Sequence, residues 1–219
     1  MTAGTRLLPS TSFEEAFWAS GDRLVAGVDE VGRGPLAGPV YAAAVILNPE
    51  ARPGWLTEVR DSKVLPASER ERLAQSIRAE AQAYGIGWST VPEIDAWGIS
   101  AANRMAMVRA LQALGSLPHR VLIDGPQTLP NFRAPQKAIV DGDALCCSIA
   151  AASIVAKVAR DEVMCQMDVV FPQYGFAAHK GYATKGHIDA LEQYGPCVQH
   201  RRSWLAVQRR GAGVWVETT

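Results

Sequence analysis

Four carboxylates in this sequence share one setting, because each follows an apolar, strand-like run and lies beside a glycine-bearing turn. Asp29 and Glu30 follow LVAGV, Asp124 follows RVLI, and Asp143 follows KAIV and a glycine. Strand ends in an α/β sheet commonly meet at one ligand crevice. Carboxylates gathered there repel one another unless a cation lies among them, and a set of oxygen ligands suits Mg²⁺ or Mn²⁺. The pattern therefore predicts a two-metal site that hydrolyses a phosphodiester.

Two of these acids also have a simpler explanation when each is taken alone. An aspartate before a glycine, as at Asp124, is typical of a turn, and Asp143 lies where it could cap the helix that follows. Asp141 is a close rival of Asp143, and spacing alone cannot separate the two. The metal-site hypothesis therefore depends on the acids as a set.

Asp29 and Glu30 pose a geometric difficulty. Neighbours in a regular strand point to opposite faces, so both reach one metal centre only if the chain bends there. Gly32 and Gly34 follow at once and make a bend easy. The loop of Gly32, Arg33 and Gly34 also combines free backbone N–H groups with a guanidinium, which suits a phosphate. The stretch therefore predicts a cation site next to an anion-binding loop.

The glycine loop also permits a different class of function. Gly32, Gly34 and Ala37 formally match the G-x-G-x-x-A fingerprint of dinucleotide-binding proteins, including oxidoreductases. That fingerprint needs a helix that starts at the loop, whereas this loop is followed by the strand-like run VYAAAVIL. The context therefore argues against this alternative, and binding of NADH would distinguish the two.

The surrounding elements must bring these residues together. Apolar runs predict five strands, over residues 24–31, 40–47, 84–91, 120–123 and 136–140. Helical spacing predicts helices over 68–84 with a capping box of Ser68 and Glu71, over 92–114 with an interruption at Gly98, over 144–170, and over a short stretch ending at Tyr194. The Ala-rich run SIAAASIVAKVARD predicts tight packing against a sheet. Together these elements predict an α/β domain on a mixed central sheet flanked by helices.

Composition narrows the class of protein. The chain has 219 residues, 48% of them hydrophobic, and no apolar run near the roughly 20 residues that a membrane span needs. Its start lacks the basic and apolar segments of a secretory signal. The four cysteines form no C-x-x-C pair, which favours reduced thiols in a cytoplasmic protein. The net charge is zero, and residues 200–202 and 209–210 predict one local basic patch.

The stretch GVDEVGRGPLAGPV resembles the signature of the type 2 ribonucleases H, the ribonuclease HII family. Further motifs follow in that family's order. They are DSK at 61–63, LIDG at 122–125, GD at 142–143, SIAAASIVAKVARD at 148–161, HKGYATKGH at 179–187 and HRRSW at 200–204. We therefore expect a leader over 1–23, a catalytic domain over 24–205 and a short C-terminal tail over 206–219.

The resemblance implies a ribonuclease H-like fold with a short helical C-terminal segment. It implies an endonuclease that hydrolyses the RNA strand of RNA–DNA hybrids and incises 5′ of single ribonucleotides in duplex DNA. The reaction would be two-metal-ion hydrolysis with Mn²⁺ or Mg²⁺, giving 3′-OH and 5′-phosphate ends. The family's metal-binding catalytic acids correspond to Asp29, Glu30, Asp124 and Asp143. We expect a cytoplasmic monomer whose partner is nucleic acid and not a membrane.

The resemblance also assigns residues that bind the substrate. The glycine loop would contact the ribose 2′-OH and the adjacent phosphate. Tyr182 would pack on the deoxyribose after the ribonucleotide, and Lys63 and Lys180 would hold phosphates. Without the resemblance, the sequence is also consistent with Tyr182 as a half-buried aromatic residue in a loop. The two lysines would then be solvated charges on the surface. Three histidines of these motifs remain unassigned: His179, His187 and His200.

Two features depart from the family pattern. Asp141 stands where the family usually has a lysine, which adds negative charge beside the metal site. The chain also stops soon after HRRSW, so its basic tail is shorter than in some relatives. Two rivals stay open on the acids alone, a ribonuclease H-like resolvase or transposase nuclease that cuts only DNA and a silent binder of hybrids. Tyr182 and the glycine loop favour ribose recognition, and the complete acid set argues against a silent binder.

Overall fold

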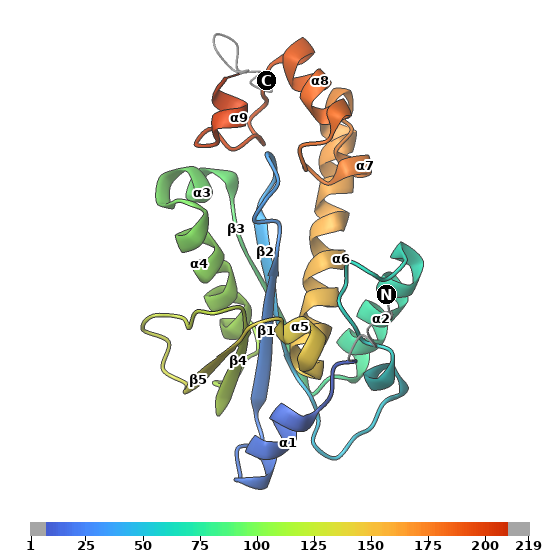
Figure 1. Cartoon of the computed structure of the whole chain (residues 1–219), viewed down its shortest axis with the longest axis vertical. Coiled ribbons are helices and arrows are strands. Elements are labelled where there is room, and N and C mark those ends of the chain that lie inside the picture. Colours follow the sequence, from blue (N-terminus) through green and yellow to red (C-terminus); the bar gives the residue numbers. More distant parts are fainter. Residues whose placement is uncertain (1–7, 210–219) are drawn as a thin grey trace, which may run out of the picture.

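The computed structural model describes residues 8–209, with a mixed five-stranded sheet at the centre (Figure 1). The strands are β1 (Val25–Val31), β2 (Val40–Ile46), β3 (Ala83–Ser89), β4 (Arg120–Asp124) and β5 (Gln136–Ile139). The α-helices are α1 (Ser12–Ala19), α2 (Ala67–Glu80), α3 (Val91–Trp97), α4 (Ile99–Gln112), α5 (Gly142–Leu145), α6 (Cys147–Val170), α7 (Phe176–His179), α8 (Lys185–Tyr194) and α9 (Leu205–Gln208). Two 3₁₀ helices are η1 (Gly54–Thr57) and η2 (Pro172–Tyr174).

β1 lies in the middle of the sheet, whose strand order is β3-β2-β1-β4-β5. It pairs antiparallel with β2 and parallel with β4, and β4 pairs parallel with β5. Each strand lies where its apolar run predicts it, within two residues at either end. The predicted mixed α/β sheet is therefore confirmed. The parallel pairing brings the ends of β1 and β4 to the same edge of the sheet.

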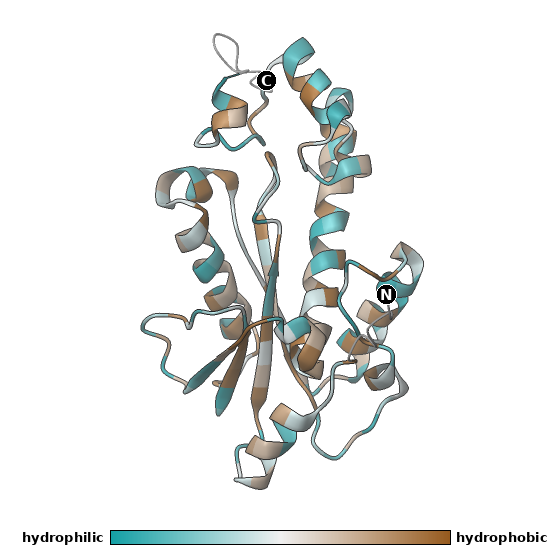
Figure 2. Cartoon of the chain, in the orientation of Figure 1, coloured by the Kyte–Doolittle hydropathy of each residue, from teal (hydrophilic) through white to brown (hydrophobic). Residues whose placement is uncertain are grey.

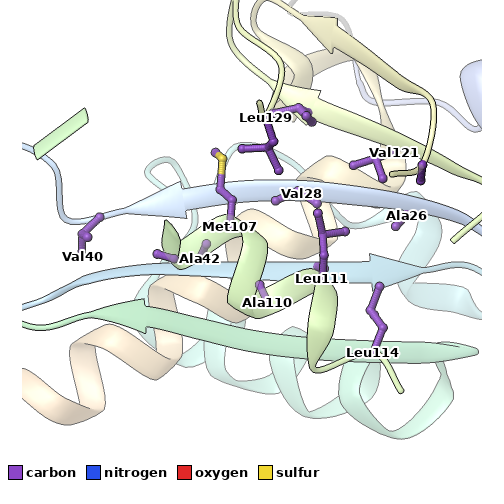
Figure 3. Close-up of a cluster of buried hydrophobic side chains, with 14 of the residues drawn as sticks. Ala26, Val28, Val40, Ala42, Met107, Ala110, Leu111, Leu114, Val121 and Leu129 are labelled. Carbon is purple, nitrogen blue, oxygen red and sulfur yellow. The ribbon is translucent and has the colours of Figure 1, made fainter. Parts of the chain in front are cut away.

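Helices cover both faces of the sheet (Figure 1). α4 packs on one face, and α6 with α2 beside it packs on the other. Met107 and Leu111 of α4 are buried against Val28 of β1 in the core drawn in Figure 3. The backbone of α4 also lies close to β3. Gly87 of β3 permits this contact, since a Cβ there would lie 2.3 Å from the carbonyl oxygen of Ala106.

The start of α6 is packed tightly against β1. Residues 147–156 of this helix are all buried, and most are small. A Cβ on Gly27 of β1 would lie 2.3 Å from the carbonyl carbon of Ser148, so only glycine admits the helix backbone this close. Figure 2 shows the apolar strands and the change to hydrophilic residues midway along α6. The tight packing predicted from the Ala-rich run is confirmed.

The predicted start and end of α2 are wrong. The helix begins directly after Pro66 with no side-chain cap, so Ser68 and Glu71 do not form the predicted capping box. Pro66 supplies an extended residue that leads straight into the first turn, which places Ser68 inside the helix. The helix also ends before the next strand, and Tyr84 belongs to β3 with a partly exposed ring.

The N-terminus of α6 is capped by a residue distant in sequence, and the prediction that Asp143 caps it is wrong. Asp143 lies inside the short helix α5, and α6 begins after Cys146. Glu14 of α1 is fully buried, and its Oε1 accepts hydrogen bonds from the Ser148 backbone N at 2.7 Å and the Cys146 thiol at 3.1 Å. A carboxylate in this position satisfies a free N–H group and favours the helix dipole. The segment expected to be a leader therefore contributes a helix to the packed structure.

The segments after α6 pack around its far end. η2 and α7 contact α6, and α8 contacts η2. His200 and Arg201 are fully buried there, so the predicted basic patch is wrong at these two positions, and Arg210 lies outside the described residues. In the part of the chain that the structure describes, no helix combines the length and apolar character needed to cross a membrane.

Candidate active site at the ends of β1 and β4

Asp29 and Glu30 lie near the end of β1 on opposite faces of the sheet. β1 keeps a regular register with β2 through Val31, so the strand itself does not bring the two side chains to one face. Asp29 is buried on the α6 side, next to the Ser153 hydroxyl. Glu30 instead lines a cleft on the α4 side. The two carboxylates therefore approach the sheet edge from different sides.

Asp124 and Asp143 complete the acid set. Asp124 ends β4, and the parallel pairing with β1 places it level with Asp29. Its Oδ1 accepts a hydrogen bond from the Gly142 backbone N at 2.7 Å, which holds the start of α5 against β4. Asp143 is half-buried beside this bond, whereas Asp141 is exposed and has a left-handed φ of 54°. The fold therefore brings Asp143, rather than Asp141, toward Asp124.

Three aspartates of the acid set have a raised pKa. Burial raises the pKa of Asp29 well above its usual range, and repulsion from the other three acids adds to the rise. Burial is also the main cause that raises the pKa of Asp124 and of Asp143, and neighbouring carboxylates contribute. A cluster of this kind carries negative charge that its surroundings compensate only in part.

The donor chemistry of this cluster fits a divalent ion. Carboxylate oxygens are the ligands that Mg²⁺ and Mn²⁺ prefer. Within residues 8–209, no three carboxylate, imidazole or thiol groups are arranged so that they could hold an ion as the side chains stand. Arg33 Nη1 lies 3.3 Å from Glu30 Oε1, and the Glu30 backbone N donates to Asp29 Oδ1 at 2.7 Å. One oxygen of each of these two carboxylates is therefore engaged by a protein donor.

The polar triplet at 61–63 brings a cation to the acids. Ser62 is buried, and its Oγ lies 2.9 Å from Oγ of Ser153 on α6. Burial alone would lower the pKa of Lys63, but attraction by Asp61 and by the site carboxylates outweighs it and raises the pKa. Lys63 is therefore a predicted basic residue that the structure does place beside the acids.

Gly32, the first residue of the glycine loop, packs against the buried guanidinium of Arg160. Gly32 has a φ of +91°, which favours glycine, and a Cβ there would lie 2.2 Å from Nε of Arg160. Arg33 comes next and lines, with Glu30 and Asp124, a cleft of about 210 Å³. The predicted anion-binding loop thus adjoins the carboxylates.

Tyr182 lies next to the glycine loop, but Lys180 is directed elsewhere. The Tyr182 side chain is 42% exposed, and a Cβ on Gly34 would lie 3.8 Å from its Cε1. Lys180 Nζ donates to the Ala177 carbonyl at 2.6 Å and to the Cys165 sulfur at 3.1 Å. The structure therefore joins Tyr182 to the loop and leaves Lys180 bound to its own surroundings.

The sequence did not indicate that four polar side chains near the glycine loop and Tyr182 are buried. They are Arg160, His187, His200 and Arg201. His187 Nε2 lies 3.0 Å from His200 Nε2, and His187 Nδ1 lies 2.9 Å from the Tyr182 carbonyl oxygen. The quoted motifs contain all four residues, but a motif alone does not show which charged side chains folding turns inward.

The fold and the acids define the class of protein. The run after the glycine loop is the strand β2, which excludes the dinucleotide-binding alternative because that fingerprint requires a helix there. A mixed sheet flanked by helices, with carboxylates at the ends of its central strands, is a ribonuclease H-like fold. A crystal structure of ribonuclease H2 from Pyrococcus horikoshii OT3 matches with a TM-score of 0.72 at 26% identity, over 86% of this chain and 97% of that one.

Sequence comparison identifies the family. The Ribonuclease HII family profile matches residues 26–207. A ribonuclease HII of Moorella thermoacetica is 53% identical over 193 residues, which are 88% of this chain and 92% of that protein. One from Bordetella avium is 50% identical over 190 residues, 87% of this chain and 92% of that protein. The chain belongs to the ribonuclease HII family and is a ribonuclease, hence a hydrolase.

Proposed function

We propose that the chain is an endonuclease that hydrolyses the RNA strand of RNA–DNA hybrids and incises 5′ of single ribonucleotides in duplex DNA. Membership of the ribonuclease HII family supports action on RNA. The observation that carries the proposal is the placement of carboxylates from β1, β4 and α5 next to the glycine loop and Tyr182. This arrangement sets a candidate reaction centre beside a candidate reader of ribose.

The four carboxylates, Asp29, Glu30, Asp124 and Asp143, would hold Mn²⁺ or Mg²⁺. When bound, a pair of such ions supplies activation of the attacking water and stabilisation of the leaving oxygen in an in-line displacement, giving 3′-OH and 5′-phosphate ends. Asp29 would contribute from the buried side of β1 and Glu30 from the cleft side. Lys63 balances part of the negative charge and would hold a phosphate.

The glycine loop and Tyr182 would recognise the ribonucleotide. The 2′-OH distinguishes RNA from DNA, and it both donates and accepts hydrogen bonds. Gly34 exposes backbone that this hydroxyl can approach, and Arg33 would hold the adjacent phosphate. The exposed ring of Tyr182 would pack on the deoxyribose that follows. Lys180 would hold a phosphate with the N–H that its bonds to the Ala177 carbonyl and the Cys165 sulfur leave over.

We further propose that the catalytic domain spans residues 24–205 and that the protein acts as a cytoplasmic monomer. All four cysteines are free thiols, which agrees with a reducing compartment. α1 packs against the proposed domain through Glu14 and would stabilise it.

Mapping the cut in a labelled duplex with one ribonucleotide tests the proposed function. The duplex is incubated with Mg²⁺, with Mn²⁺ or with a chelator, beside an all-DNA duplex of the same sequence. We expect one cut on the 5′ side of the ribonucleotide, only when an ion is present. Cutting of the all-DNA duplex would indicate a nuclease that acts on DNA, and tight binding of hybrid without any cut would indicate a silent binder.

A further inference from the structure

One buried guanidinium, that of Arg160 in α6, joins the glycine loop to the segment that carries Tyr182. The Arg160 side chain is fully buried. Its Nε donates to the Pro39 carbonyl at 3.0 Å and its Nη2 to the Ala37 carbonyl at 3.3 Å, both between β1 and β2. Its Nη1 donates to the Lys180 carbonyl at 3.0 Å. A single planar group therefore holds both segments.

The two segments also touch directly. The Leu36 backbone N donates to the Gly181 carbonyl at 2.8 Å. A Cβ on Gly181 would lie 2.5 Å from the Ala37 carbonyl oxygen, and one on Gly32 would lie 2.2 Å from Nε of Arg160. With no side chain between the two backbones, or between Gly32 and the guanidinium, a shift of one segment displaces the other.

The chemistry of this contact requires arginine. The three hydrogen bonds of Arg160 all end on backbone carbonyl oxygens, and a buried charge is costly unless its donors are matched in this way. A lysine keeps the charge, but its single ammonium cannot span three carbonyls as a planar guanidinium does. Lysine at this position would therefore loosen the link while leaving the charge in place.

Arg201 provides an internal comparison, because it is equally buried but holds only one of the two segments. Its guanidinium donates to the carbonyls of Gly32, Arg33 and Gly38, and all three belong to the loop between β1 and β2. Replacement of Arg201 would disturb the glycine loop without releasing the segment of Tyr182 directly.

We propose that Arg160 is a positioning residue that fixes Tyr182 relative to the glycine loop and so sets the preference for a single ribonucleotide over a continuous hybrid. This inference rests on the proposed function. A continuous hybrid offers a 2′-OH at every step, so small errors in register between the loop and Tyr182 are tolerated. A lone ribonucleotide has one 2′-OH, and it must meet both segments at once.

A double-mutant cycle tests whether Arg160 acts through Tyr182. The kcat/KM for a duplex with one ribonucleotide is divided by the kcat/KM for a continuous hybrid of the same sequence. We expect Arg160→Lys to lower this ratio about tenfold, since small misplacements of a binding group have effects of this size or larger. In the Tyr182→Ala background, Arg160→Lys is expected to change the ratio little, because the contact it positions is already absent.

Controls separate positioning from loss of stability. Leu73→Ala removes a fully buried side chain in α2 and is expected to lower stability without changing the ratio. Arg201→Lys is expected to speed amide exchange mainly in 32–39, because the Arg201 guanidinium holds the glycine loop and makes no bond to the segment of Tyr182. Amide hydrogen exchange adds a readout without substrate. Arg160→Lys should speed exchange in 32–39 and 180–184 more than in the rest of the fold, whereas Leu73→Ala should produce no such excess in these two segments.

The inference is overturned if Arg160→Lys leaves the ratio unchanged, or if its effect multiplies undiminished with that of Tyr182→Ala. It is also overturned if exchange in the two segments stays at the wild-type rate. Should the wild-type protein cut neither duplex, the proposed function fails, and the exchange measurement still decides whether Arg160 couples the two segments.

Discussion

Asp29 occupies a position that disfavours its own charge, because it is buried and faces other carboxylates. Asp29→Asn is expected to lower the rate of cleavage by at least about 100-fold, because removal of one stabilising group from a reaction centre has effects of this size. It should also raise the free energy of unfolding of the ion-free protein, by about 1 kcal/mol, since a neutral amide relieves the repulsion. Cleavage assays with Mn²⁺ and urea unfolding with a chelator measure the two effects. Cleavage at the wild-type rate would contradict the role of Asp29.

The raised pKa of Asp29 makes the free energy of unfolding of the ion-free protein depend on pH. Because the folded pKa of Asp29 is raised, the folded state binds more protons, so its contribution to the free energy of unfolding falls as pH rises from about 4 through the raised pKa. Burial lowers the pKa of His187 to about 4 and of His200 to about 3, so these groups act in the opposite sense up to about pH 6.5.

Comparing the wild type with Asp29→Asn at each pH separates these opposing contributions. Both proteins carry the same histidines, so their difference reports the carboxylate alone. The stability advantage of the variant in chelator should grow as pH rises from about 4 toward neutrality. An advantage that is constant across this range would contradict repulsion at Asp29.

Tyr182 is the residue at which ribose recognition is most directly tested. Tyr182→Ala should slow incision at a single ribonucleotide more than it weakens binding of the duplex, because the role proposed for the ring is to orient the sugar. Tyr84→Ala is a matched control, since the Tyr84 side chain is 40% exposed on β3 and Tyr182 is 42% exposed. Single-turnover rates and binding constants measure the split. Equal loss on every substrate would count against a role at the junction.

At the scale of elements, the contact between β1 and α6 positions Asp29. Gly27→Ala is expected to cost about 1–3 kcal/mol, because a Cβ at Gly27 would lie 2.3 Å from the Ser148 backbone. Gly54→Ala is the control, since a Cβ there meets nothing within 4 Å. Chemical denaturation measures both. Equal stability of the two variants would mean that α6 yields to the added carbon at little cost.

Strands were easier to predict than the ends of helices, and the reason is the range of the determining contact. Each strand is an apolar run bounded by turn residues, so its signal lies within its own residues. The start of α6 depends instead on Glu14, which is more than 130 positions away in the sequence. Single-turn helices such as α5 and α7 have too few residues for a periodic pattern.

Site residues at the ends of strands could be predicted from the sequence. Site residues whose position depends on tertiary packing could not. Carboxylates after apolar runs indicate one edge of a sheet, as found for Asp29 and Asp124. The sequence could not show that Arg201, expected on a basic surface, folds inward onto the glycine loop. Nor could it show that Lys180 is bound to the Ala177 carbonyl. Such contacts depend on which segments tertiary folding brings together.

At the scale of the whole molecule, the parallel pairing of β1 and β4 sets the site. It fixes Asp29 and Asp124 on neighbouring rigid strands, while the start of α5 adds Asp143 through the bond from Gly142 to Asp124. The segments after α6 then supply Tyr182. The proposed function therefore depends on β1, β4 and α5, whose carboxylates meet at one sheet edge and are proposed to bind cations there as a unit.

Titration of Mn²⁺ by calorimetry tests this claim most directly, with wild type, Asp143→Asn and Asp141→Asn compared under identical conditions. Both substitutions remove one negative charge, but only Asp143 is half-buried beside Asp124, whereas Asp141 is exposed. The account predicts that Asp143→Asn abolishes or greatly weakens Mn²⁺ binding and that Asp141→Asn retains it. Equal binding by all three proteins, or loss only in Asp141→Asn, would contradict the account.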